Sequence, residues 1–138
     1  MSDVDFARLD PQAAEHRFQR LRAELGVTTF GINLIVLEPR MRMRVHRHER
    51  QEEVYLVLAG ELTLVLDDGD ERVLRAGELA RVAAPVRRQL INRGTGRLEL
   101  LALGGHGEHE GRDGRAYSDW TETGEGRSPA EVPLPDDE

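Results

Sequence analysis

A region of short β-type segments makes up more than half of the chain. From Thr28 to Leu103, runs of aliphatic and β-branched residues are separated by turn residues about every 8 to 12 positions, which is typical of a sandwich or barrel. No β-α alternation points to a parallel sheet. We therefore predict an all-β, antiparallel jelly roll. The expected strands are Thr29–Leu37, Met41–His48, Glu53–Leu58, Glu61–Leu66, Glu71–Leu74, Leu79–Val82, Arg88–Asn92 and Arg97–Leu103.

Residues 1–27 precede this barrel region, which we place at 28–103. Asp10 and Pro11 are typical of an N-cap and a first helical residue. Apolar residues then recur at helical spacing as far as Leu25, and Gly26 stands where a helix would end. We predict one amphipathic N-terminal α-helix from about Pro11 to Leu25, packed on the barrel or on a second subunit.

Residues 104–138 form a Gly-rich and acidic C-terminal tail, predicted to be largely extended or disordered. Tyr117 and Trp120 are the exception, because two aromatic residues in such a segment can anchor it to the barrel. His106 and His109 have the i, i+3 spacing of metal ligands but lie among glycines.

Two of the predicted strands are apolar on nearly every residue, namely Val54–Leu58 and Leu62–Leu66. A strand with one face in water would alternate, so both faces are expected to be covered. One face would line the barrel and the other would meet the helix or another protomer, which predicts a homodimer. Ala59-Gly60 between the two strands is interpreted as a hairpin turn.

The composition excludes several classes of function. The chain has no cysteine, hence no disulfide or thiolate ligand, and all nineteen basic residues are arginine, which excludes a Schiff-base lysine. A net charge of −7 argues against a nucleic-acid partner. No apolar run approaches the roughly 20 residues of a membrane span. The acidic N-terminus lacks the order of a secretory signal, so we expect a cytoplasmic protein without a membrane partner.

The most specific chemical signal is a spaced pattern of four residues between positions 46 and 60. His46 and His48 stand at i and i+2, so on a strand their imidazoles point to the same face. Glu53 on the next strand can complete a set of two histidines and one carboxylate, which suits a first-row divalent metal. Gly60 closes the pattern: His-x-His, four residues, Glu, six residues, Gly.

This pattern resembles the first signature of the cupin superfamily, small barrels also called double-stranded β-helices. The resemblance implies that His46, His48 and Glu53 are metal ligands for iron, manganese, nickel or zinc. The family's opening glycine is not matched, because Arg40 holds that position.

The second cupin signature supplies a fourth ligand, a histidine, and here the sequence departs from the family. Counting forward from Gly77 and back from Asn92 places Arg88 at the histidine position. Taking Pro85 as the motif proline instead places Leu90 there, so neither register supplies an imidazole. A guanidinium about 5 Å from a divalent ion would repel it by roughly 6 to 7 kcal/mol at an effective dielectric constant of 20.

Three arrangements of Arg88 are compatible with the sequence. It can turn away from a three-ligand metal site, pair with Glu53 in a metal-free pocket, or bind a ligand's carboxylate or phosphate. Tyr55 lies two residues after Glu53 and can line the same pocket.

Two functions follow. One is a metal-dependent protein acting on a small molecule, as in cupins that catalyse oxygenation, isomerisation or decarboxylation. The other is a metal-free binding module in which Arg88 holds an anionic ligand. Metal-free sugar epimerases of this fold, with a histidine base and a tyrosine acid, are a subordinate option for Tyr55. The pattern assigns ligands but no catalytic residue.

Overall fold

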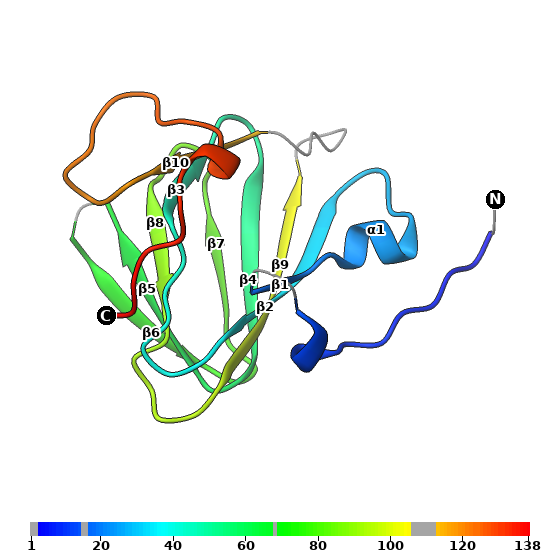
Figure 1. Ribbon diagram of the computed structural model, residues 1–138. Coiled ribbons are helices and arrows are strands. Elements are labelled where there is room, and N and C mark those ends of the chain that lie inside the picture. Colours follow the sequence, from blue (N-terminus) through cyan, green and yellow to red (C-terminus); the bar gives the residue numbers. More distant parts are fainter. Residues whose placement is uncertain (1–2, 15–16, 68, 106–112) are drawn as a thin grey trace.

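The structure, a computed structural model, describes residues 3–14, 17–67, 69–105 and 113–138 (Figure 1). Two antiparallel five-stranded sheets form the walls of one barrel. Sheet A has the strand order β1 (Phe18–Gln19), β2 (Gly31–Leu37), β9 (Leu98–Gly105), β4 (Glu52–Ala59) and β7 (Leu79–Val82). Sheet B has the order β10 (Gly114–Tyr117), β3 (Val45–His48), β8 (Arg88–Ile91), β5 (Glu61–Leu66) and β6 (Glu71–Arg75).

The predicted all-β jelly roll is confirmed, and the eight expected strands correspond to β2 through β9. The interpretation of Ala59-Gly60 as a hairpin turn is wrong. β4 pairs with β7 and β9, whereas β5 pairs with β6 and β8, so the turn carries the chain from one sheet to the other. Gly60 has a φ of +80°, and a Cβ there would lie 2.4 Å from the carbonyl oxygen of Arg97. Only glycine fits this corner.

The core lies between the sheets and is built from side chains that alternate inward along each strand. Tyr55 and Val57 point inward from β4, and both are almost fully buried. β8 is buried on both faces: Arg88 and Leu90 lie on one face and Gln89 and Ile91 on the other. The inner face of β8 therefore brings one cation into an otherwise aliphatic barrel.

The N-terminal helix is present but much shorter than predicted. A 3-10 turn, η1, covers Pro11–Ala13, and the α-helix α1 covers only Leu21–Leu25. Between them Phe18 and Gln19 form β1, because they pair with Ile35 and Leu34 at the edge of sheet A. The predicted ends are correct, since the Asp10 side chain caps η1 and Gly26 ends α1 in the left-handed conformation.

From residue 113 onward the C-terminal segment lies in a largely extended form against sheet B (Figure 1), so of the two predicted alternatives, extended or disordered, these residues follow the first. Strand β10 pairs with β3, and the 3-10 turn η2 (Pro129–Glu131) follows. The predicted anchors are confirmed. Tyr117 is 1% exposed, and the Trp120 indole donates a 2.9 Å hydrogen bond to the Gln89 side chain. Arg87 lies over both aromatic rings.

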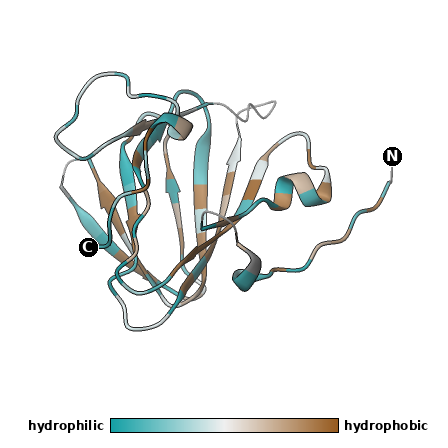
Figure 2. Cartoon of the chain, viewed as in Figure 1, coloured by the Kyte–Doolittle hydropathy of each residue, from teal (hydrophilic) through white to brown (hydrophobic). Residues whose placement is uncertain are grey.

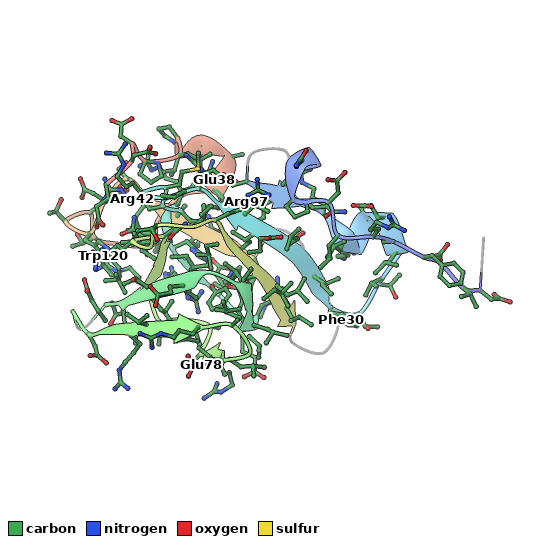
Figure 3. The ribbon with its side chains drawn as sticks, turned by 90° about the horizontal axis from the view of Figure 1, so that it is seen from below. Phe30, Glu38, Arg42, Glu78, Arg97 and Trp120 are labelled. Carbon is green, nitrogen blue, oxygen red and sulfur yellow. The ribbon has the colours of Figure 1, made fainter. Side chains whose placement is uncertain are left out.

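The N-terminal and C-terminal segments lie on opposite sides of the barrel in Figure 1. Figure 3 shows Trp120 at one end of the barrel and Phe30 at the other, with the paired Glu38 and Arg97 between them and the N-terminal segment extending beyond Phe30. Among the described residues, no helix is long and apolar enough to cross a membrane.

Candidate functional site

Three strands from both sheets bring five polar side chains together inside the barrel. β3 supplies His46 and His48, which share one face because they are two residues apart. β4 supplies Glu53 and Tyr55 in the same way. Arg88 on β8 lies directly across from His46 in the sheet register. All five residues that the sequence singled out thus occupy one site, whereas His106 and His109 lie outside the described residues.

One carboxylate oxygen is the centre of the cluster. Oε1 of Glu53 lies 3.4 Å from Nε2 of His46 and 3.2 Å from Nε2 of His48. The Tyr55 hydroxyl donates a 2.5 Å hydrogen bond to the same oxygen, which fixes the carboxylate in the barrel. The two imidazole rings are nearly perpendicular, with their centroids 5.3 Å apart.

The shifted pKa values leave His46 neutral, Glu53 ionised and Tyr55 protonated. Burial lowers the pKa of His46 below its ordinary value, so the ring is neutral near pH 7. Burial also opposes ionisation of Glu53, but the two neighbouring imidazoles outweigh it and hold the pKa of Glu53 well below its usual value. Burial, and then the adjacent carboxylate, raise the pKa of Tyr55, so its hydroxyl keeps its proton.

Both ring nitrogens of His46 face hydrogen-bond acceptors, although the neutral ring has only one N–H to donate. Its Nδ1 lies 3.3 Å from the backbone oxygen of Arg44, and its Nε2 faces Glu53. A neutral imidazole carries one ring proton, and both neighbours are acceptors, so only one of these contacts can be a hydrogen bond. Both ring nitrogens of His48 are buried without a hydrogen-bond partner. Acceptor atoms that converge in this way are suited to hold a cation.

The donor set fits a divalent metal. His46, His48 and Glu53 each offer one ligand atom, and these atoms lie within 4.8 Å of one another. Two neutral imidazoles and one carboxylate are a set that first-row divalent metals bind with coordination positions left open. The three residues could therefore hold a metal ion.

Arg88 occupies the remaining side of the site and is fully buried. Its Nη2 donates to the backbone oxygen of Ala83 at 2.9 Å. Its Nη1 lies 3.6 Å from Oε1 of Glu53, an ion-pair distance too long for a hydrogen bond. Nε and Nη1 have no hydrogen-bond partner. Of the three arrangements considered for this residue, the structure contains the pairing with Glu53.

Sequence reasoning missed a second carboxylate near the site. Asp113 is 3% exposed and accepts backbone hydrogen bonds from Arg50 and Gln51. Its Oδ2 lies 3.7 Å from Nδ1 of His48, on the side of the ring away from Glu53. A carboxylate in this place favours the tautomer that leaves Nε2 unprotonated. It comes from the C-terminal segment, 65 positions beyond the histidine, and no local motif announces it.

Comparison with known families identifies the fold. The family model described as a cupin domain matches residues 33–104, which are 72 of the 138 residues. The chain belongs to the cupin family. A comparison with curated proteins finds no match.

Several solved structures share this cupin fold. A sugar phosphate isomerase of the cupin superfamily from Silicibacter pomeroyi is 29% identical; the match covers 72% of this chain and 76% of that one, with a TM-score of 0.61. A protein from Acidithiobacillus ferrooxidans, provisionally named a sugar phosphate isomerase, is 26% identical over 70% of this chain, with a TM-score of 0.60. This chain spans 60% of its length, less than two thirds. A Cupin 2 conserved barrel domain protein from Salinispora arenicola is 23% identical over 76% of this chain and 91% of that one, with a TM-score of 0.67.

Proposed function

We propose that this cupin binds a divalent first-row metal through His46, His48 and Glu53, and that the loaded site takes a small molecule with a carboxylate or phosphate group, which Arg88 contacts. The observation that supports this proposal most directly is the convergence of unsatisfied acceptors. The neutral His46 faces two acceptors with one proton, and the buried nitrogens of His48 have no hydrogen-bond partner. A cation between the rings and the carboxylate would satisfy all three side chains.

A count of charges supports the coupling of metal and anion. Without a metal, the Glu53 carboxylate and the Arg88 guanidinium cancel, and the buried Asp113 carboxylate beside His48 adds a negative charge. A buried site without excess positive charge has little attraction for an anion. A divalent ion would add two positive charges, and the two nitrogens of Arg88 without a hydrogen-bond partner, Nε and Nη1, could then donate to the incoming oxygens.

The names of two similar structures suggest a class of substrate. Both are described as sugar phosphate isomerases, and their identities of 29% and 26% exceed the 23% of the third match described above. A sugar phosphate carries the dianion that a loaded site would attract. A bound metal would act as a Lewis acid toward a carbonyl or hydroxyl oxygen. Within the protein, Tyr55 would orient the Glu53 carboxylate, and Arg88 would bind the phosphate of the substrate.

Metal analysis tests the first half of this proposal. We expect close to one metal ion per chain in wild-type protein, before chelation or after reloading with iron, manganese, nickel or zinc. Glu53→Gln and His48→Ala should lose it. Glu52→Gln is the matched control, because Glu52 is the adjacent carboxylate on β4 but is mostly exposed. A wild-type protein that binds none of the four metals would overturn the proposal.

A metal-free binding module is the second candidate. The paired Glu53 and Arg88 and the unused N–H groups of Arg88 favour it. The two functions can be distinguished by calorimetry, in which protein stripped of metal by a chelator is titrated with inorganic phosphate or a hexose phosphate. Binding that needs no metal and disappears in Arg88→Met would support the module. Binding that appears only after metal loading would support the coupled site.

Homodimerisation and a cytoplasmic location stay predictions.

A further inference from the structure

The outer face of sheet A carries a continuous aliphatic surface. Side chains of β4 alternate, so that Tyr55 points into the barrel and Val54 and Leu56 point outward. The register places Leu103 beside Val54, and Leu101 and Leu79 on either side of Leu56; the β7 neighbour of Val54 is Arg81. We call this surface the aliphatic stripe; its residues are Val54, Leu56, Leu58, Leu79, Leu101 and Leu103.

The chain's own helix leaves most of this surface uncovered. α1 packs Leu21 against Leu34 and Val36 of β2, and of the stripe residues only Leu101 is packed against this cluster. On the strands beyond, Leu79 is 62% exposed and Leu58 is 38% exposed. The expectation that both faces of β4 are covered is therefore unmet within one chain. A contiguous exposed apolar surface of this kind typically marks an interaction site.

A second apolar element extends from the same side of the molecule. The N-terminal arm, residues 3–9, runs away from the barrel in Figure 1 and carries hydrophobic stretches in Figure 2. Phe6 is 88% exposed and Val4 is 64% exposed. Val4 and Phe6 stand at i and i+2; Asp3 precedes Val4, and Asp5 lies between the two apolar residues. An extended arm can therefore bury one face and keep its carboxylates in water.

The base of the arm is held by hydrogen bonds, so its direction is part of the fold. The Gln19 side chain accepts from the backbone N–H of Asp10 at 2.8 Å and donates to the backbone oxygen of Arg8 at 2.9 Å. Gln19 itself is only 8% exposed. Figure 1 shows the arm running from this base away from the barrel.

We propose that the N-terminal arm of one copy lies on the aliphatic stripe of a second copy, with a symmetric exchange of arms in a homodimer. One surface then accounts for both the exposed arm and the exposed sheet. A phenylalanine side chain buries roughly 150–250 Å². Two arms, each burying Val4 and Phe6 against a similar area of sheet, would cover on the order of 1,200 Å², which is the lower end of the range for a stable interface. The proposal does not depend on the metal site.

The oligomeric state gives the first test. Light scattering after size exclusion should find a dimer for wild-type protein, and Phe6→Asp and Leu79→Arg should each raise the dimer dissociation constant at least about tenfold. Both residues are exposed, so neither change should alter the barrel. Val73→Asp is the matched control, because Val73 is 50% exposed on β6 of the other sheet. A monomeric wild type, or a dimer indifferent to Phe6→Asp, would overturn the proposal.

Cross-linking locates the arm directly, because the chain has no cysteine of its own. Phe6→Cys and Leu58→Cys are made in separate, differently tagged chains, which are mixed and oxidised. We expect a mixed disulfide between the two, and much less with Val73→Cys as the partner. A double variant that instead forms the disulfide within one chain would place the arm on its own sheet and contradict the exchange.

Discussion

Replacing Arg88 should strengthen metal binding, although Arg88 is the most deeply buried charge in the described part of the site. Its Nη1 lies 3.6 Å from the carboxylate oxygen that would bind the ion, so a guanidinium remains close to any bound metal. At about 5 Å and an effective dielectric constant of 20, the repulsion is roughly 6 to 7 kcal/mol. Each 1.4 kcal/mol is a factor of ten in affinity. Because the His46 side chain is still 21% exposed and some water screens the site, we expect Arg88→Met to raise metal affinity at least about 100-fold.

Competition with a chromophoric chelator measures this change, with zinc or cobalt as the ion. Methionine keeps the length of the side chain and suits the apolar barrel; the substitution leaves the backbone oxygen of Ala83 without its partner, which costs about 1–3 kcal/mol of folding stability. Thermal melting of the variant checks that it is folded. Arg72→Met removes an equal charge from an exposed position on β6 and should leave metal affinity unchanged. A folded Arg88→Met with unchanged or weaker metal affinity would refute the electrostatic reasoning.

Three further predictions concern the fold and its pH dependence. Gly60→Ala should lower the free energy of unfolding by about 3 kcal/mol or more in urea titrations, because its Cβ would meet a backbone oxygen at 2.4 Å; Gly69→Ala, with a similar φ but open space, should cost only about 1 kcal/mol. Trp120→Phe removes an indole hydrogen bond and should destabilise the protein by about 1–2 kcal/mol, with no effect if the C-terminal segment does not contribute to stability. In metal-free protein, folding lowers the pKa of His46 from 6.5 and that of Glu53 from 4.5, so the unfolded chain binds more protons in both ranges. Stability should be full above pH 6.5 and should fall as the pH drops below 6.5 and again below 4.5; urea midpoints that stay constant from pH 7 to pH 4 would contradict this.

The barrel could be predicted from the sequence because each strand carries its own signal. Apolar runs of four to eight residues between turn residues need no tertiary information to be recognised. The helix prediction was too long because Phe18 and Leu21 occur at helical spacing but bury their side chains by different means. Phe18 does so from a strand at the edge of sheet A, and Leu21 from a single helical turn. Arg17, with a φ of +71°, interrupts any continuous helix just before Phe18.

The site could be predicted only in part, because its residues differ in how local their signals are. His46, His48 and Glu53 lie within eight positions; strand alternation puts the two histidines on one face, and a short connection brings Glu53 from the next strand. Arg88 required an alignment to a family signature, and the structure brings it to Glu53. Asp113 was missed because a four-residue strand, β10, carries it into place, and this strand is too short and too polar to stand out in the sequence.

An arginine in place of a fourth imidazole changes the thermodynamics of the site and not only its ligand count. A histidine would strengthen metal binding whether or not a substrate is present. A guanidinium beside Glu53 weakens metal binding in the free protein and strengthens anion binding in the loaded one, so metal and anion should each raise the other's affinity by the same factor. Measuring metal affinity at increasing phosphate concentration tests this reciprocity. Equal metal affinities with and without phosphate would mean that Arg88 does not contact the anion, and the coupled site proposed here would be wrong.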